Sequence, residues 1–317
     1  MFYHFLIAYP EIAYKDGYGK SLDTDCVTPT EFRRSLEELY KNNFVLCNLN
    51  DYFERQEDGT LKAAQLMLPE GKKPLIISFD DISYYKKNLG KGTCDKVIID
   101  PATGKLAMLT VLADGTEQIT YNNDVIPMLE AFCEEFPDFA PFGVQGMLCL
   151  TGYDGILGYR TQSDSPNRES EIAAVEPIVA KLKDNGWYFS SHGYGHIHEG
   201  QVTLEKLKAD ADKWEAEVAP LLGYPRIHVF PYGDYANAGL FKGGLTDPRM
   251  LYLLNEKKFD VLCGVGMKPF YKMLDKYVFM DRANIDGVSL RRGTHLEGLM
   301  DPAYVYCPEE RNNIPRQ

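Results

Sequence analysis

The sequence predicts an α/β protein with a mainly parallel sheet, either open or closed into a barrel. Apolar, β-branched or aromatic runs alternate with helical stretches along most of the 317 residues. The run LIISF, residues 75–79, is apolar apart from Ser78, as expected of a strand buried on both faces. Strands that alternate with helices in this way are typical of parallel sheets.

The individual elements follow from local signals. Thr28 and Glu31 are spaced as a capping box, with Pro29 at the first helical position, so a helix is expected to begin there. The expected helices cover residues 28–42, 169–184, 204–222 and 247–259. The expected strands cover residues 2–9, 44–49, 75–79, 187–191, 227–230 and 260–266.

One region breaks the alternation. Residues 97–121 contain two turn signals, PATGK and ADGTE, between short β-prone runs, which predicts a small antiparallel meander. The chain shows no internal repeat and no interdomain linker. We therefore expect a single domain over residues 1–317, with a small β insertion at about 94–122.

Composition excludes several classes of partner. The net charge of -12 and the pI near 5.0 disfavour binding to nucleic-acid phosphates and to anionic lipid. No apolar run is long enough to span a membrane. The seven cysteines are scattered singly, which predicts buried thiols rather than disulfides or a cysteine zinc site. The N-terminus resembles a strand rather than a signal peptide, so either the protein is cytoplasmic or a leader is missing from this sequence.

Three of the six histidines lie in SSHGYGHIH, residues 190–198. His192 and His196 are four residues apart, a spacing that on one helical turn places both rings on the same side, within reach of one ion. The alternative is a loop with solvated histidines, and the pair by itself does not decide between the two. His198 is either a third ligand or, as we expect, a partly exposed neighbour.

Asp80 and Asp81 follow the buried run LIISF directly. Acids at the carboxyl end of a parallel strand stand where α/β enzymes build their sites, although a helix cap or turn is the ordinary alternative. Two imidazoles and one carboxylate form a zinc-type ligand set with an open position for water. The second carboxylate then accepts a proton from that water.

A third stretch, HVFPYGDY, covers residues 228–235. Pro231 fixes the backbone after a predicted strand, and Gly233 permits a tight turn. Backbone N–H groups at such a turn can point toward a developing oxyanion, whereas an ordinary turn at the end of a strand is the alternative.

The order LIISFDD, SSHGYGH and VFPYG resembles the polysaccharide deacetylase family, also called the NodB-homology domain or carbohydrate esterase family 4. Its motifs are T/S-F-D-D, H-[S/T]-x-x-H and P-[Y/F]-G. VTPTEFRRSLEELYKNNFVLCNLNDYF resembles the family's opening helix and strand. The opening FYH resembles the M-Y-H of many secreted members and places His4 among the substrate-binding candidates. The resemblance implies an α/β fold, namely an irregular (β/α) barrel of NodB type. The predicted antiparallel meander is inserted into this barrel.

The resemblance also implies roles. Asp80 is expected to act as the general base, and Asp81, His192 and His196 are expected to bind one divalent metal. That metal is expected to be zinc, with cobalt, nickel and manganese as alternatives. The backbone N–H of Tyr232 is expected to stabilise the oxyanion, with Pro231 and Gly233 beside the substrate.

Three departures from the family pattern are visible. Gly193 stands where the family has Ser or Thr, so a hydroxyl that braces the metal histidines is missing. The Arg that orients the base in the family does not precede Pro231, and Arg282 is the predicted substitute. The family's late L-x-H motif has no clean copy here, which leaves His295 as the candidate catalytic acid. The alternative is that His295 is an ordinary surface loop residue.

Aromatic residues add candidate sugar contacts. Tyr153 and Tyr159 lie in the Gly-rich segment LTGYDGILGYR, residues 150–160, and tyrosine rings stack well on sugar faces. Because the chain contains 21 tyrosines, ordinary packing is the alternative for each of them. Trp214, on an expected amphipathic helix, is predicted to lie in the core.

The resemblance therefore predicts a metal-dependent hydrolase that removes N-acetyl groups from a polysaccharide containing N-acetylglucosamine and releases acetate. One alternative is a glycan-binding member of the same fold with weak or no catalysis. Another is an amidohydrolase acting on a small non-sugar substrate. A carbohydrate is the expected partner, and secretion or association with the cell envelope is the expected localisation, with a cytoplasmic protein as the alternative. The oligomeric state is not predicted.

Overall fold

The fold is built on one large sheet. The computed structural model describes residues 1–15, 17–241, 244–267, 270–293, 295–314 and 316. Within these ranges eight strands form the sheet, all parallel to their neighbours except the last, β14. In spatial order they are β1 (Phe2–Tyr3), β6 (Ser78–Asp80), β10 (Met147–Leu150), β11 (Tyr188–Ser191), β12 (Ile227–Val229), β13 (Val261–Val265), β15 (Val278–Arg282) and β14 (Phe270–Met273).

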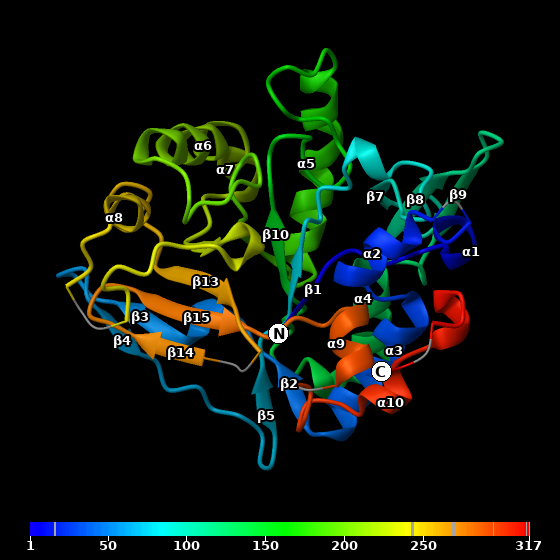
Figure 1. Cartoon of the computed structure of the whole chain (residues 1–317), viewed down its shortest axis with the longest axis horizontal. Coiled ribbons are helices and arrows are strands. Elements are labelled where there is room, and N and C mark those ends of the chain that lie inside the picture. Colours follow the sequence, from blue (N-terminus) through cyan, green and yellow to red (C-terminus); the bar gives the residue numbers. More distant parts are fainter. Residues whose placement is uncertain (16, 242–243, 268–269, 294, 315, 317) are drawn as a thin grey trace.

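The sheet curls, so that its first strand meets the segment that follows β15. The Phe2 N–H donates to the Ala283 carbonyl, and the Ile285 N–H donates to the Phe2 carbonyl, both at 2.9 Å. Figure 1 shows β1 near the centre of the molecule, between β10 and the chain leaving β15. The prediction of a mixed α/β protein with a mainly parallel sheet is confirmed.

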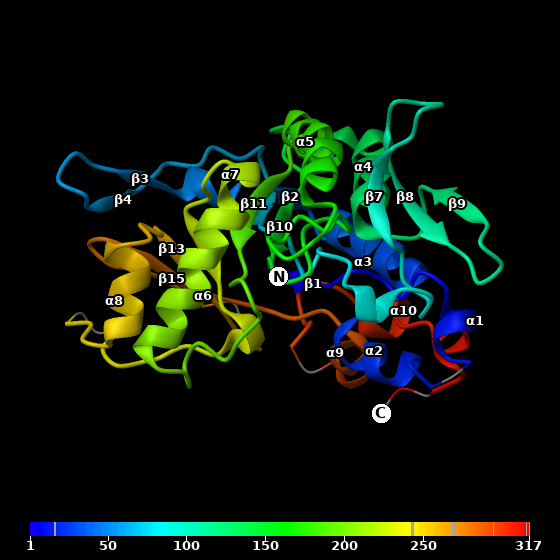
Figure 2. The ribbon, with the colours of Figure 1, turned by 90° about the horizontal axis from the view of Figure 1, so that it is seen from above.

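Helices flank the curled sheet at both ends of the molecule. Figure 2 shows α6, α7 and α8 on one side of the molecule and α2, α3, α9 and α10 on the other. The α-helices are α1 (Pro10–Ala13), α2 (Gly19–Asp25), α3 (Pro29–Lys41), α4 (Val125–Glu135), α5 (Arg168–Asp184), α6 (Leu204–Glu217), α7 (Ala219–Leu222), α8 (Pro248–Asn255), α9 (Gly287–Arg292) and α10 (Pro302–Val305). Short 3-10 helices are η1 (Leu49–Tyr52), η2 (Lys86–Asn88), η3 (Pro137–Phe139), η4 (Pro231–Gly233) and η5 (Pro308–Arg311).

The predicted capping box is present at α3. The Thr28 hydroxyl accepts a hydrogen bond from the Glu31 N–H, and the Glu31 carboxylate accepts one from the Thr28 N–H. Both residues are fully buried, so this start of α3 is fixed in the core.

Three smaller sheets flank the main one. Strands β2 (Phe44–Leu46) and β5 (Lys73–Leu75) pair parallel, and β3 (Phe53–Arg55) and β4 (Leu61–Ala63) pair antiparallel. Strands β7 (Lys96–Ile99), β8 (Leu106–Val111) and β9 (Glu117–Thr120) pair antiparallel in chain order. This last sheet occupies the range for which the sequence predicts a meander.

Two predicted strands differ from the structure. The run 75–79 does not form one strand: Leu75 ends β5 against β2, whereas Ser78 and Phe79 belong to β6 in the main sheet. The expected strand 2–9 stops at Tyr3, because the backbone beyond it bonds to other partners. Leu6 N–H donates to the Asp124 carboxylate, and Ile7 N–H donates to the Val27 carbonyl.

The core is apolar and rich in aromatic rings. Phe79 on β6 packs against the rings of Tyr3, Phe32 and Trp187, joining the sheet to α3. Trp214 is buried as predicted, and all seven cysteines are buried and unpaired. Among the described residues, no helix combines the length and apolar character that a membrane span requires.

Candidate active site

The candidate site lies where neighbouring parallel strands end. Asp80 is the last residue of β6 and Asp81 follows it, whereas His192 follows β11 directly. Strand β10 pairs with both β6 and β11, and β11 pairs with β12, so their carboxyl ends share one edge. The edge is therefore the place where α/β proteins bind ligands.

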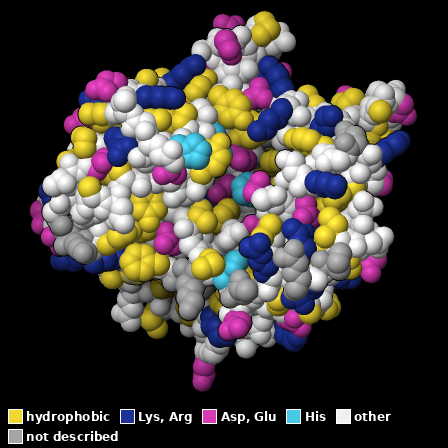
Figure 3. All heavy atoms as spheres, in the orientation of Figure 1, with side chains coloured by type: hydrophobic (Ala, Val, Ile, Leu, Met, Phe, Trp, Pro, Cys, Tyr) yellow, Lys and Arg dark blue, Asp and Glu magenta, His cyan; other side chains and the backbone are white. Residues whose placement is uncertain are grey.

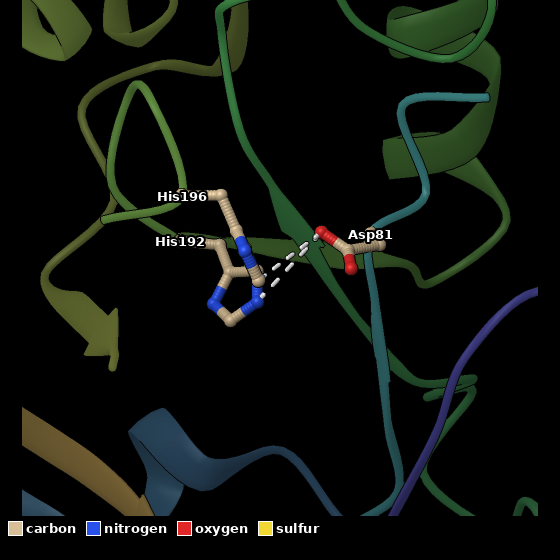
Figure 4. Close-up of side chains that lie close together, drawn as sticks. All are labelled: Asp81, His192 and His196. Carbon is tan, nitrogen blue, oxygen red and sulfur yellow. Dashed lines mark ion pairs between the residues drawn. The ribbon is translucent and has the colours of Figure 1, made fainter. Parts of the chain in front are cut away.

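Asp81, His192 and His196 converge, as the sequence predicts. The Asp81 Oδ1 atom lies 3.9 Å from His192 Nε2 and 3.7 Å from His196 Nε2. One ligand atom from each of the three residues lies within 4.8 Å of the other two. Figure 4 shows both imidazoles pointing toward the carboxylate. Two ligands bound to one zinc ion at about 2.0–2.1 Å lie at most about 4.2 Å apart, so the Asp81–histidine separations fit a shared ion.

Neighbouring groups orient the ligands. His192 Nδ1 lies 2.9 Å from the Val229 carbonyl oxygen, so the ring donates there and leaves Nε2 for an ion. The Tyr85 hydroxyl donates to Asp81 Oδ1 at 2.5 Å and also lies 2.8 Å from Thr151 Oγ1. Support of this kind from surrounding hydrogen bonds is typical of metal sites.

The protonation states suit a cation. Burial lowers the pKa of His192, and burial also lowers the pKa of His196 to about 4, so both rings are neutral near pH 7. Burial opposes ionisation of Asp81, but the nearby His196 and His192 outweigh it, and the pKa of this carboxyl lies below its usual range. Neutral imidazoles and a carboxylate are the forms that bind metals.

Backbone conformations at the site are unusual. Asp81, His196 and Tyr232 have φ angles of 59°, 50° and 59°, in the left-handed region that non-glycine residues rarely adopt. Such residues gather at functional sites, where the surrounding fold holds them in place.

Asp80 is held by Arg282, the predicted substitute for the family's Arg. Arg282 donates from Nη1 to Asp80 Oδ1 at 2.7 Å and from Nη2 to Oδ2 at 2.9 Å, and Nη1 also donates to Ser78 Oγ. Burial would raise the pKa of Asp80, but the Arg282 guanidinium and His192 outweigh it and hold that pKa well below its usual range. Asp80 is therefore ionised at neutral pH.

A cavity of about 310 Å³ opens over these residues. Figure 3 shows acidic and histidine side chains gathered in a hollow near the middle of this face. The lining residues are Phe2, His4, Asp25, Asp80, Asp81, His192, His196, Phe230, Tyr232, Gly233, Val265, Asn284 and Asp286. Within the cavity, His4 Nδ1 lies 2.8 Å from the Asp25 carbonyl oxygen, which leaves Nε2 unused by that bond.

Two aromatic pairs flank the three ligands, and each contains one accessible tyrosine ring. Tyr232 stacks on His198 with ring centroids 4.0 Å apart and also contacts the His196 ring. Tyr153 stacks on Tyr85 with centroids 4.7 Å apart. Tyr232 is 60% exposed and Tyr153 is 36% exposed, so both rings are accessible.

The predicted site residues Tyr159, His295 and Pro231 do not line the cavity. Tyr159 is buried, and its hydroxyl donates to the Val97 carbonyl, so packing rather than sugar contact accounts for it. His295 Nε2 lies 3.1 Å from the Asn284 carbonyl oxygen, and His295 does not line the cavity. Pro231 is buried beside the cavity without lining it.

Other lining or supporting residues were not predicted. Tyr85, Asp25, Asn284 and Asp286 belong to this group. The only sequence signal for Tyr85 is its position four residues after Asp81. Asp25 and Asp286 carry no motif of their own, because the fold rather than local spacing brings them to the cavity.

Comparisons with known proteins gave matches to solved structures alone. No protein-family model matches the chain, and no curated protein matches it. Streptococcus pyogenes deacetylase PplD, solved in complex with acetate, is 11% identical, with 84% of this chain and 86% of that chain covered and a TM-score of 0.47.

Two further solved structures match. BA0330 of Bacillus anthracis, assigned as a polysaccharide deacetylase, is 13% identical over 90% of this chain and 64% of its own, with a TM-score of 0.49. A Mycobacterium smegmatis protein with the same assignment is 14% identical over 52% of this chain and 47% of its own, with a TM-score of 0.32. The names agree with the family that the three sequence motifs resemble.

Proposed function

We propose that this protein is a metal-dependent hydrolase that removes N-acetyl groups from a polysaccharide containing N-acetylglucosamine. The observation that carries the proposal is the convergence of Asp81, His192 and His196 in one cavity with Asp80, whose carboxylate is held from behind by the buried Arg282. The reaction breaks the amide C–N bond, joins the oxygen of water to the acetyl carbon, and yields acetate and a free amine.

Asp81, His192 and His196 would hold one divalent ion. Two imidazoles and a carboxylate suit zinc, with cobalt, nickel and manganese as alternatives. When bound, the ion would lower the pKa of the water molecule attached to it and would polarise the amide carbonyl. The chain leaves room for substrate and water because the ligands line an open cavity.

Asp80 is the proposed base. Each of its oxygens accepts one hydrogen bond from Arg282, and a carboxylate oxygen has a second lone pair that can accept the proton of water. The two bonds also fix the orientation of the carboxylate. A positioned base of this kind typically contributes about 10²–10⁴-fold to the rate.

The leaving amine needs a proton, and His4 is better placed than His295 to provide it. His4 lines the cavity with Nδ1 fixed on the Asp25 carbonyl, whereas His295 lies outside the lining. We therefore assign proton donation to His4 Nε2 in place of the predicted His295. The backbone N–H of Tyr232 remains the proposed oxyanion donor.

The exposed rings of Tyr153 and Tyr232 are the proposed sugar contacts. They belong to the Tyr85–Tyr153 pair beside Asp81 and the His198–Tyr232 pair beside His196. A pyranose ring presents C–H groups that pack on aromatic faces. A polysaccharide substrate also agrees with the secreted or cell-envelope location that the motif resemblance implies.

Acetate release from N-acetylglucosamine oligomers tests the proposal. The metal-loaded wild type is expected to release acetate, whereas the Asp80→Asn variant and the chelated protein are expected to release little. Oligomer binding without release would instead support a glycan-binding protein. Release only from small non-sugar amides would support the amidohydrolase alternative.

A further inference from the structure

The loop His192–His196 carries both candidate imidazole ligands and needs support from the rest of the fold. Gly193 has a φ of 63° and His196 a φ of 50°, so two of its residues lie in the left-handed region. The hydroxyl that braces this loop in the family is missing, because Gly193 stands at its position.

Asp210 on α6 contacts the backbone of the loop directly. Its Oδ2 atom accepts a hydrogen bond from the Tyr194 N–H at 2.6 Å, and its Oδ1 atom accepts one from the Gly195 N–H at 2.8 Å. Both oxygens of one carboxylate therefore bind consecutive peptide groups between the two histidines. Charge-assisted bonds of this kind are about twice as strong as neutral ones.

A buried chain of polar groups supports the start of the same loop. The Gly193 N–H donates to Ser191 Oγ at 3.3 Å, and Ser191 Oγ lies 3.2 Å from His228 Nδ1. His228 Nε2 lies 2.9 Å from Glu199 Oε2, and the side chains of both residues are 2% exposed. A buried hydrogen-bond network of this type rigidifies the segment it holds.

Packing alone does not hold this side of the loop. A cavity of about 220 Å³ lies behind it, lined in part by Ser191, Gly193, Glu199, Asp210 and His228. Because apolar side chains do not fill the space on this side, the hydrogen bonds supply the restraint there, whereas the buried ring of Tyr194 anchors the loop in the core.

The geometry also explains why glycine occupies position 193. A Cβ atom there would lie 3.0 Å from Glu199 Oε1 and 3.2 Å from Asp210 Oδ2, tighter than ordinary contacts. The positive φ of Gly193 adds strain for any other residue. The two carboxylates thus occupy the space beside the loop that a serine or threonine side chain would enter.

We infer that Asp210 is a positioning residue that, together with the Ser191–His228–Glu199 chain, holds His192 and His196 in their ligand geometry. The carboxylate replaces the side-chain hydroxyl that the motif lacks. This inference rests on the proposed metal site, because the loop needs such a restraint only if its two imidazoles bind one ion.

Calorimetric titration of metal-free protein with zinc tests the inference. Asp210→Ala is expected to weaken zinc binding about 10–100-fold, as for other residues that orient metal ligands. Asp210→Asn keeps one acceptor oxygen and is expected to recover part of the affinity. Asp212→Ala is the matched control, because it removes one acid from the same helix at a side chain that is 55% exposed and pairs with Lys257.

The outcomes separate the inference from the proposed function. No zinc binding by the wild type would overturn the proposed metal site. Wild-type binding with unchanged affinity in Asp210→Ala would overturn the positioning role, even if its melting temperature fell. If Asp210→Ala does not fold, Gly193→Ser takes its place: we expect about 10-fold weaker binding, and equal or tighter binding would overturn the inference.

Discussion

Arg282 donates one hydrogen bond to each carboxylate oxygen of Asp80, although the two residues are 202 positions apart in the sequence. The two side chains extend from β15 and β6, which are not neighbours in the sheet. The Arg282 guanidinium also lies over the ring of Phe2 on β1, at 4.4 Å from its centroid. The curl of the sheet therefore brings the candidate base and its partner together.

Replacing Arg282 with lysine should slow the reaction and shift its pH dependence. Lysine keeps the positive charge but cannot reproduce the planar two-donor contact. The pKa of Asp80 should therefore rise from its depressed value, and the acidic limb of kcat/KM should move to higher pH. We expect a loss of about 10–100-fold near neutral pH, measured as a pH–rate profile. An unchanged profile would contradict the proposed coupling.

Asp80→Asn should abolish turnover while retaining the metal. The amide has the same shape but cannot take up a proton from water, so the rate should fall by about 10²–10⁴-fold. Elemental analysis should still find one equivalent of metal, because Asp80 is not one of the three ligands. Full turnover of this variant would exclude Asp80 as the base.

Tyr85→Phe should weaken metal binding without disturbing the aromatic pair with Tyr153. The variant removes the hydroxyl that donates to Asp81 Oδ1 and keeps the ring that stacks on Tyr153. We expect zinc affinity to fall by about 10-fold in a calorimetric titration. Tyr153→Phe serves as the control, and similar losses in both variants would argue against a specific role of the Tyr85 hydroxyl.

The parts of the site that were predicted share one property: they lie at the ends of strands within short motifs. Each predicted ligand or base stands within a few residues of an apolar run that predicts a strand: Asp80, Asp81, His192 and His196. Because the carboxyl ends of parallel strands lie at one edge of a sheet, these strand ends predict that the four side chains meet there. The Arg282 contact is predicted only because the third motif lacks its usual arginine. No sequence pattern around Arg282 itself indicates the contact.

The parts that were missed depend on tertiary contacts. Nothing in the run 75–79 indicates that β2 would pair with Leu75 while β1 and β10 pair with the residues after it. Tyr159 was a plausible sugar contact by residue type, but burial decides its role. Asp210 lies on an ordinary amphipathic helix, and its partners are backbone N–H groups that carry no sequence signal.

Asp124 should make the stability of the fold depend on pH. This fully buried residue caps α4, and burial raises its pKa to about 7. Between about pH 4 and pH 7 the unfolded chain loses this proton while the folded protein keeps it, so the free energy of unfolding falls as pH rises. The total change is on the order of 4 kcal/mol.

The Asp124→Asn variant tests this expectation by thermal or denaturant unfolding. It cannot ionise, so its stability should vary less between pH 5 and pH 8 than that of the wild type. At pH 8 it should be the more stable protein. Equal pH dependence of the two proteins would show that Asp124 ionises normally in the folded state.

Zinc titration of metal-free wild type, Asp81→Ala and His192→Ala tests the shared-ion site most directly. The wild type should bind one equivalent, and each variant should lose that binding, because two ligands remain where three converge. Absence of binding by the wild type, or undiminished one-equivalent binding by either variant, would contradict a metal site at Asp81, His192 and His196.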